Sequence, residues 1–456
     1  MKVAVAGGGI AGLAAARRLE AVAPDAEIVL IESDVVLGGK LRTEHVDGFV
    51  IEAAPDSFLS RKERGVGLVQ ELGLGEELIA RRPEHHHTFV RRGGDLHPLP
   101  EGLTGMIPTN LDALERSELL SPEGKVRFSS EPDVPTAPGV EDESVAAFIS
   151  RRFGREAYEA LVEPLMTGIY GGDGDQLSLR ATFPQLRALE LERGSILRGV
   201  SAPPPSELPP FVSLRDGMGS LVSGVVDALE RTDLRRGRAA ARVARRPDGY
   251  GLELVDGEVI DVDGVVIATP AYVTADLLAD LDPALASAHA AIPYASSVVV
   301  TLAFSRAEVT PLDGYGYLVP RVEGADVLAC TWTSQKWEGR APEDSVLIRV
   351  YAGRFGGRDL TEDSDESLVA LARAEVGLSG VDAVPLLTQV HRWPLGMPQY
   401  LLGHPERLAQ IDAALSGYPG LALAGAAYRG VGIPDCIRSG ELAAESVARA
   451  LAGAPV

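Results

Sequence analysis

The 456-residue sequence predicts an α/β fold whose main domain is assembled from both ends of the chain. An apolar run at residues 2–6 precedes three glycines and a stretch rich in Ala, Leu and Arg, which is the strand, turn and helix pattern of a parallel sheet. Residues 421–425 form a second such strand, followed by glycines and a helical pattern. Between the two ends, residues 103–172 have helical periodicity and residues 275–405 are richer in strand-like runs. We therefore expect a helical insert and a sheet-based α+β second domain.

The first glycine turn has the spacing of a Rossmann-like dinucleotide site. Gly7 permits the tight turn, Gly9 lets the backbone approach a pyrophosphate, and Gly12 lets the helix pack closely on the strand. The helix N-terminus would present free N–H groups and a positive dipole to the phosphates. A second strand at residues 27–31 ends at Glu32, where a carboxylate can accept both ribose hydroxyls. Strand, glycines, helix, strand and acid follow in order, which predicts dinucleotide binding.

A second pair of glycines follows the acid. Residues 37–43, with Gly38 and Gly39, would let the chain run along an extended cofactor beyond the first nucleotide. This run resembles the second FAD signature of the amine-oxidase-like flavoprotein superfamily, in which it lies along the pyrophosphate towards the flavin. The resemblance implies FAD as the cofactor.

Composition limits the function. With 45% hydrophobic and 24% charged residues the chain is an ordinary globular mixture, long enough for about two or three domains. The net charge of -22 argues against broad nucleic-acid binding and against adhesion to an anionic membrane surface. Any acidic ligand therefore needs a local basic pocket. Only five of the 43 basic residues are lysine, which draws attention to Lys40 and Lys62 beside the motifs, although solvated surface is an alternative for both.

Cysteines and apolar runs bear on the compartment. Cys330 and Cys436 lie far apart, without the spacing of a metal site or a disulfide framework, which fits a reducing cytoplasm. The first apolar run is interrupted by glycines, so we interpret it as a strand rather than a signal peptide. No run approaches the roughly 20 apolar residues that cross a bilayer, and peripheral membrane contact stays open.

The next stretch continues the first domain. Residues 47–58 predict a short strand that breaks at an Ala-Pro pair and passes close to the cofactor. A basic cluster with Arg61 and Lys62 follows, and residues 66–77 predict a helix. Three histidines at residues 85–87 resemble a metal cluster, but in a strand their side chains would point to opposite faces. We predict no metal site.

Helical periodicity then predicts the insert. Residues 142–144 form a helix start before apolar residues at helical spacing. Residues 129–143 contain three prolines and several acids, which predicts an exposed loop, and the five prolines of residues 201–210 mark a boundary. After it, residues 217–222 open a helix and alternating strands return the chain to the first domain, which is therefore discontinuous.

One run of the second domain has two different faces. Of residues 345–351, alternate positions are all apolar, whereas the other face combines Leu347, Arg349 and Tyr351. A mixed face of this kind could look into a pocket. The same pattern also fits an Arg and a Tyr that face solvent.

Over nearly its whole length the chain resembles the bacterial protoporphyrinogen oxidase family, which includes coproporphyrinogen III oxidases without membrane segments. The opening motifs are shared with amine oxidases and desaturases, while the later ones look specific to porphyrinogen oxidases. The resemblance rests on residues 7–13, 38–43, 48–58, 163–173, 177–184, 392–400 and 428–441.

The resemblance implies three parts and non-covalent FAD. The FAD domain would comprise residues 1–64, 213–275 and 406–456, the substrate domain 65–104, 175–212 and 276–405, and the helical insert 105–174. The implied FAD contacts are Gly7, Gly8, Gly9, Ile10, Ala11, Gly12, Glu32, Ser33, Gly39, Lys40, Arg42, Ala54, Pro55, Asp56, Ser57, Val243, Trp393, Val431, Gly432 and Ile433. Relatives often have Arg or Trp at the position of Lys40 and Gly at that of Ala54.

It also implies a reaction. Six electrons leave the porphyrinogen through one flavin, dioxygen becomes hydrogen peroxide, and no metal is required. The proton acceptor for a pyrrole N–H would be water or a main-chain carbonyl around residues 168–171. We expect coproporphyrinogen III as substrate, because the absence of a long apolar run fits a soluble tetracarboxylate. The alternatives are protoporphyrinogen IX or, more remotely, the substrate of a flavin amine oxidase or polyene desaturase.

A tetra-anionic substrate needs a basic pocket in a chain of this charge. We expect Arg61, Lys62, Arg349 and Arg354 to meet the propionates and Tyr351 to lie against the macrocycle. For each of these five residues, the alternative is a side chain that faces solvent. The oligomeric state and any membrane or ferrochelatase contact stay open.

Overall fold

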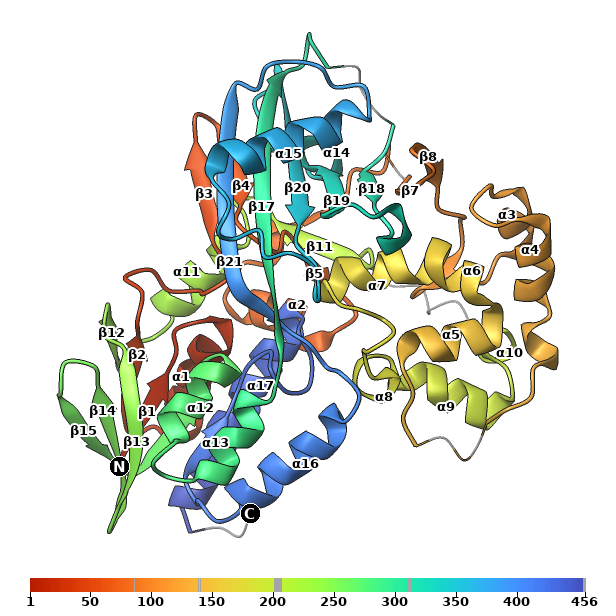
Figure 1. The fold of residues 1–456 in the computed structure, drawn as a ribbon. Helices are drawn as coiled ribbons and strands as arrows, with labels where there is room; N and C mark the ends of the chain where they lie inside the picture. The colour runs from red at the N-terminus through yellow and green to blue at the C-terminus, as the bar shows by residue number, and fades with distance from the viewer. Residues whose placement is uncertain (86, 138, 140, 201–206, 310–312, 454–456) are drawn as a thin grey trace.

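A computed structural model describes residues 1–85, 87–137, 139, 141–200, 207–309 and 313–453. In Figure 1 a parallel-sheet domain with both termini lies at the lower left, a large antiparallel sheet stands above it, and a group of helices lies to the right. The arrangement agrees with the predicted mixed α/β class.

The first domain is built on five parallel strands in the order β12, β2, β1, β16, β22. The central strands are nearly continuous apolar runs, as expected where helices or a second sheet cover both faces. Their bounds are β1 Lys2–Ala6, β2 Glu27–Glu32, β12 Thr232–Arg236, β16 Gly264–Ile267 and β22 Leu421–Leu423. This order brings three separate segments of the chain into one sheet.

The two ends of the chain meet on one face of this sheet. α1 (Ile10–Val22) lies beside α17 (Ile433–Leu451), and both supply the same hydrophobic core. A Cβ at Gly440 would lie 2.0 Å from the carbonyl oxygen of Ala11, so only glycine allows this close crossing. The opposite face is covered by β13 Ala240–Arg246, β14 Gly249–Leu254, β15 Val259–Val262, α12 Ala271–Leu278, α13 Pro283–Ala290 and α16 His404–Leu415.

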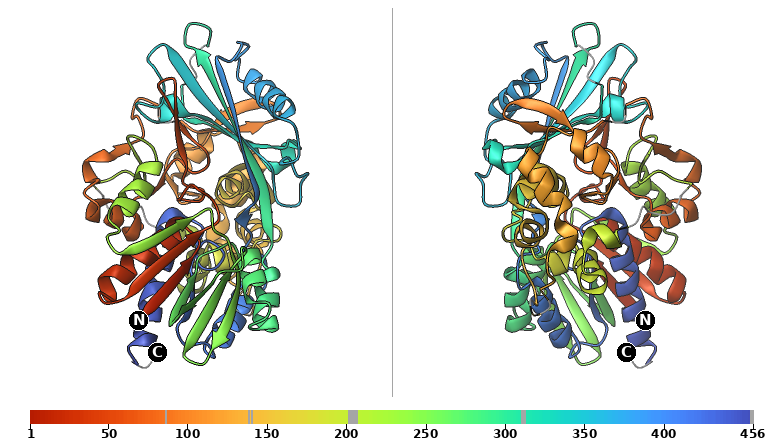
Figure 2. Two further views of the ribbon diagram at one scale, coloured as in Figure 1. Left: turned by 90° about the vertical axis from the view of Figure 1, so that its left-hand side faces the viewer. Right: turned by 90° about the vertical axis from the view of Figure 1, so that its right-hand side faces the viewer.

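The second domain is a seven-stranded sheet in the order β21, β17, β20, β19, β18, β7, β8. All neighbours are antiparallel except β18 and β7. The bounds are β7 Phe89–Arg92, β8 Asp95–Pro98, β17 Tyr294–Ser305, β18 Gly316–Leu318, β19 Val327–Trp332, β20 Ser345–Ala352 and β21 Leu387–Pro398. α15 (Asp365–Gly377) covers one face, and the hairpin of β3 (Thr43–Val46) and β4 (Phe49–Glu52) packs on the other (Figure 2).

The alternation along β20 follows the predicted pattern. Its apolar face packs in the core under α15, while Leu347 packs on the β4 hairpin. Arg349 is fully buried and Tyr351 is half-buried, so the mixed face looks into the protein rather than into solvent.

The helix expected to start at residues 142–144 is present, and further helices continue beyond residue 174. Ser144 caps α5, its Oγ accepting from Ala147 N at 3.1 Å. Phe148 shares a core with Leu186 and Ile196, which lie beyond the expected end at residue 174, so the helical packing unit reaches about residue 199. The helices are α3 Leu111–Arg116, α4 Pro122–Ser129, α5 Val145–Phe153, α6 Arg155–Ala157, α7 Glu163–Tyr170, α8 Leu179–Thr182, α9 Pro184–Arg193 and α10 Ile196–Gly199. A π-helical turn, Tyr158–Val162, joins α6 to α7.

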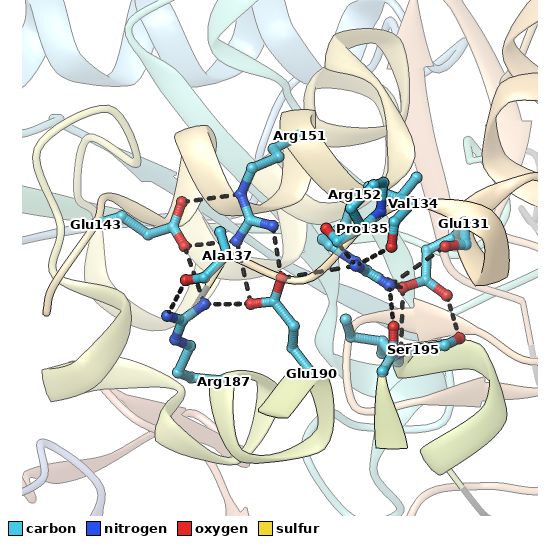
Figure 3. A network of polar contacts seen from close by, with 12 residues as sticks. Glu131, Val134, Pro135, Ala137, Glu143, Arg151, Arg152, Arg187, Glu190 and Ser195 are labelled. Carbon is cyan, nitrogen blue, oxygen red and sulfur yellow. Dashed lines mark hydrogen bonds and ion pairs between the residues drawn. The ribbon is translucent and has the colours of Figure 1, made fainter. Parts of the chain in front are cut away.

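A buried network of carboxylates and guanidinium groups holds these helices together (Figure 3). Glu131 is fully buried and accepts from Arg152 Nε at 2.7 Å, from Ser195 Oγ at 2.5 Å and from Ile196 N at 3.0 Å. Glu190, also fully buried, pairs with Arg151 at 2.6 Å. The proline-rich stretch at 129–143, expected to be an exposed loop, therefore begins with a buried acid.

Two further expectations differ from the structure. The helix expected at residues 66–77 is α2 (Glu63–Glu71), which ends before Gly73 (φ +74°), and Gly75–Glu77 is a separate 3-10 turn. Residues 85 and 87 lie in a loop before β7 rather than in a strand, and His86 lies outside the described residues. Small pairings complete the fold: β5 Phe58–Leu59, β6 Leu78–Ala80 and β11 Phe211–Leu214 form one sheet, and β9 Leu103–Thr104 pairs with β10 Ile107–Pro108.

Within the described ranges, no three His, Cys, Asp or Glu side chains are grouped as a metal site would require. Among the helices of the same ranges, none is long and apolar enough to span a bilayer.

Candidate active site

The glycine turn between β1 and α1 has the shape that a pyrophosphate requires. Gly7 has φ +108°, and a Cβ at Gly12 would lie only 1.8 Å from the carbonyl oxygen of Gly7. A Cβ at Gly9, in contrast, would meet nothing within 4 Å. Gly9 is also the N-cap of α1 and supplies no side-chain cap, so the first N–H groups of the helix, at Ile10 and Ala11, are left for a ligand. The turn is thus closely packed at Gly7 and Gly12 and has free space at Gly9.

Glu32 lies at the carboxyl end of β2 and is held against the turn. Its Oε2 accepts from Gly8 N at 2.6 Å, and its Oε1 accepts from Ser33 Oγ at 2.9 Å and from Asp34 N at 2.8 Å. The carboxylate is half-buried. A fixed acceptor beside a glycine turn is what a ribose hydroxyl pair needs.

The second glycine pair runs beside the first. Gly38 N donates to Gly8 O at 2.8 Å, and Gly38 and Gly39 both have positive φ, at +106° and +59°. Arg42 contacts Asp34 at 2.8 Å and so lies next to the ribose end. Lys40 directly follows Gly39, and burial lowers the pKa of its ammonium group.

Val243 differs from the other expected cofactor contacts. Its side chain is fully buried in the core of the β13–β15 sheet. Any contact with a nucleotide would therefore come from its main chain.

The glycine turn with Glu32 is the first wall of the candidate site. Residues 53–57 form the second wall and are tied to the large sheet. Trp393 Nε1 donates to Ala53 O at 2.9 Å, and Arg349 donates to Ala54 O. Asp56 is buried and accepts from Lys336 Nζ at 3.0 Å. Ala54, Pro55 and Ser57 stay half-buried, so this segment keeps one side accessible.

The start of α17 forms the third wall. Gly432 is its N-cap, and Asp435 Oδ2 accepts from Gly432 N at 3.3 Å. Lys62 pairs with the same carboxylate. Val431 and Gly432 are half-buried, and the N-terminal end of this long helix would stabilise negative charge on a bound group. The buried Cys436 lies close to Lys40, and burial raises the pKa of its thiol to about 12.

The main chain after α7 is fastened between the helical part and the large sheet. Gln399 Nε2 donates to Tyr170 O at 2.8 Å, Phe355 N donates to Gly171 O at 2.8 Å, and Arg321 Nη2 donates to Gly172 O at 3.2 Å. Two side chains and one main-chain N–H, all from segments that follow strands of the large sheet, therefore fix this turn.

The expected basic residues lie in different surroundings. Arg61 is exposed, and Lys62 is engaged with Asp435. Arg354 is 8% exposed, lies 3.5 Å from Glu163, and donates to the carbonyl oxygens of Val319 and Val327. Its guanidinium thus contacts protein groups in this structure, and a contact between Arg354 and a propionate stays a prediction.

Arg349 stands above Tyr351, with its guanidinium carbon 5.0 Å from the ring centroid. Burial raises the pKa of the Tyr351 phenol, so this ring is neutral at physiological pH. The two residues thus belong to one packed group on the inner face of β20.

Sequence reasoning missed several residues that hold the walls of the site. The rarity of lysine is the signal for Lys336, which is one of only five in the chain. Tyr400 lies within a recognised motif, and its hydroxyl donates to Ala426 O at 2.6 Å and accepts from Gly430 N at 2.9 Å. Gln399 lies in the same motif, but its bond to Tyr170 O spans 229 positions. Arg321 and Trp337 had no local signal, because Gly172 and Asp56, which they contact, are more than 140 residues away.

Comparison with known proteins defines the class. Residues 10–448 match the family model described as flavin containing amine oxidoreductase. The chain belongs to this family, and its cofactor is a flavin. Cyclohexylamine oxidase from Brevibacterium oxydans IH-35A has the same fold, with a TM-score of 0.71 over 99% of both chains at 17% identity.

Other relatives are closer. The chain is 35% identical to the coproporphyrinogen III oxidase of Bacillus subtilis, over 97% of this chain and 96% of that protein. It is 32% identical to the protein of the same name from Staphylococcus aureus, over 98% of both. A solved structure from Exiguobacterium sp. 255-15, provisionally assigned as a protoporphyrinogen oxidase, has a TM-score of 0.88 at 34% identity over 98% of both chains.

Proposed function

We propose that this protein oxidises coproporphyrinogen III to coproporphyrin III with non-covalently bound FAD, using dioxygen as the electron acceptor and releasing hydrogen peroxide. The observation that carries the proposal is the length of the similarity to the coproporphyrinogen III oxidases. It spans nearly the whole of both chains, so it includes the helical part and the large sheet as well as the flavin domain. Relatives that share only the general fold are 17% identical or less.

In this proposal the FAD lies across the three walls. The N-terminus of α1 holds the pyrophosphate at Gly9, and Glu32 accepts the ribose hydroxyls. Residues 53–57 and 431–433 border the flavin ring, which is supported by their one accessible side and by the helix dipole of α17. When bound, the flavin supplies the redox chemistry by taking electrons from the macrocycle.

The residues of the chain orient the substrate and exclude competing reactions. Tyr351 lies against the macrocycle, and Arg61 and Lys62 lie on the side from which a propionate would approach. The carbonyl groups of Tyr170, Gly171 and Gly172 already accept hydrogen bonds from the protein. This favours water, or the carbonyls of residues 168 and 169, as the acceptor of a pyrrole proton.

A side-by-side assay of coproporphyrinogen III and protoporphyrinogen IX tests the substrate. We expect the higher kcat/KM for coproporphyrinogen III without detergent, with about three dioxygen molecules consumed per porphyrin because each takes two of the six electrons. A clearly higher kcat/KM for protoporphyrinogen IX would instead favour the alternative substrate. If neither compound bleaches the flavin under anaerobic conditions, the protein is an oxidase of another class or a flavin-binding protein without redox activity.

Replacing Tyr351 by Ala should lower kcat roughly a hundredfold, because a displacement of the reacting carbon by about 1 Å has a cost of that order. Flavin content should stay unchanged. Steady-state kinetics on the variant measures the effect, with Tyr250→Ala as a control, since Tyr250 lies in the β13–β15 sheet away from the substrate face. Equal losses in the two variants would mean that Tyr351 contributes only packing.

A further inference from the structure

A buried carboxylate connects the segment at residues 53–57 to the large sheet. Asp56 is 7% exposed, and both its oxygens contact Lys336 Nζ, at 3.1 and 3.0 Å. Trp337 Nε1 donates to the same carboxylate at 3.1 Å, and Arg349 Nη1 lies 3.6 Å away. Lys336 and Trp337 belong to or follow α14 (Thr333–Lys336), which stands beside β20 in the second domain. The acid and its partners thus come from different domains.

The main chain around this acid is fastened as well. Arg349, which faces Asp56, also donates to Ala54 O. Ser213 Oγ donates to Asp56 O at 2.6 Å. Together with the bond from Trp393 to Ala53 O, these contacts hold three residues of the proposed flavin wall, Ala53, Ala54 and Asp56. Most of the donors belong to the domain that carries the substrate face.

The charges around Asp56 favour its ionised form. Burial alone would raise the pKa of Asp56, but Lys336 and Arg349 outweigh burial and lower the pKa well below its usual range. Burial lowers the pKa of Lys336, and Asp56 opposes that shift. Arg340 and Glu52 form a neighbouring pair 3.7 Å apart, and the positive charge of Arg81 also acts on Lys336. Asp56 and Lys336 therefore form a largely buried ion pair in which each charge stabilises the other.

The same group of residues reaches the substrate face. The Arg349 guanidinium contacts Asp56, binds Ala54 O, and stands over the ring of Tyr351. A shift of Asp56 would change the position of this guanidinium and hence the support of the ring. The contacts of Arg349 thus link the flavin wall to Tyr351.

We propose that Lys336 is a positioning residue which, through Asp56 and Arg349, aligns the flavin wall at residues 53–57 with the substrate face at Tyr351. This inference rests on the proposed function for the location of flavin and substrate. It adds that the second domain preorganises the cofactor site, although Lys336 itself touches neither the flavin nor the substrate. Without the pair, the wall samples positions that cannot hold the flavin, so the apparent affinity for FAD falls by the fraction of competent molecules.

The test compares Lys336→Met with Lys125→Met. Lys125 is a matched control, because it is a half-buried lysine of α4 whose Nζ donates to Glu115 O. FAD is titrated into flavin-free protein and followed by quenching of flavin fluorescence. We expect the Kd for FAD to rise about tenfold in Lys336→Met, which corresponds to one competent molecule in ten, and to stay unchanged in Lys125→Met. On saturating FAD, kcat should fall more than KM rises.

Two further variants distinguish a loss of FAD binding from a loss of folding. Lys336→Arg keeps the charge and should recover most of the FAD affinity. Asp56→Asn combined with Lys336→Met removes both buried charges, so it should fold at least as well as Lys336→Met while keeping the loss of FAD affinity. The inference is overturned if the melting temperature falls while the Kd for FAD and kcat stay within about twofold of the parent protein, since a merely structural pair would behave so.

The FAD titration also separates this inference from the proposed function. If coproporphyrinogen III is not oxidised but Lys336→Met still loses FAD affinity, the substrate assignment fails and the positioning of the wall stands. If coproporphyrinogen III is oxidised equally well by both lysine variants and both bind FAD equally, the function stands and the positioning role is refuted.

Discussion

A Glu32→Ala protein is expected to lose its flavin during gel filtration. The Glu32 carboxylate is half-buried and fixed by Gly8 N at 2.6 Å, so it would accept the ribose hydroxyls without further ordering. A hydrogen bond to a charged acceptor contributes about 1.5–3 kcal/mol, which corresponds to a roughly 10- to 150-fold higher Kd. Flavin absorbance per protein after the column measures the effect.

Two controls show what the loss means. Glu27→Ala removes an exposed acid at the other end of the same strand and should leave flavin content unchanged. Glu32→Gln keeps an acceptor for Gly8 N without the charge, so its flavin affinity should be intermediate. Full flavin occupancy in Glu32→Ala would contradict the assignment of Glu32 to the ribose.

Arg152→Met is expected to destabilise the helical part by about 3–5 kcal/mol, because it leaves the fully buried Glu131 carboxylate without its cation. Ser195 Oγ and the main-chain N–H of Ile196 would remain as donors but cannot neutralise the charge. Urea unfolding monitored by circular dichroism measures the free energy of unfolding.

The matched control is Arg155→Met. Arg155 forms exposed ion pairs with Glu159 and Asp175, and such pairs contribute only about 0–1 kcal/mol. Glu131→Gln combined with Arg152→Met should recover part of the lost stability, because position 131 then carries no unpaired buried charge. Equal destabilisation by the two arginine variants would argue that the buried network of Figure 3 adds nothing beyond packing.

Features with a local cause could be predicted closely. The strand at residues 2–6, the turn and the long closing helix appear at or near the expected residues, because glycine spacing and apolar periodicity express short-range geometry. The alternation along β20 was also predictable, since side chains in a strand point to opposite faces. Which of the two faces is buried could not be predicted, because burial depends on the elements that pack against the strand.

Other features depend on partners that are distant in the sequence. The helical part extends to α10 because Leu186 and Ile196 pack on Phe148, and no local pattern shows this. The stretch after residue 129 has the composition of a loop, yet Glu131 is buried since Arg152 and the α10 backbone satisfy it. Arg354 has the chemistry of an anion ligand, and only the fold directs it onto main-chain carbonyls.

The sequence by itself determined the α/β class, the glycine turn with its acid at Glu32, and the use of both chain ends in one domain. The glycine turn and its acid follow from residues within about 30 positions of each other. The use of both chain ends was predictable because each end carries its own strand, glycine and helix pattern. The tertiary structure alone decided that Lys336 meets Asp56, 280 positions away, and that Arg349 joins the flavin wall to Tyr351. A buried ion pair carries no local signature, because its two halves are stable only when the fold brings them together and removes them from water.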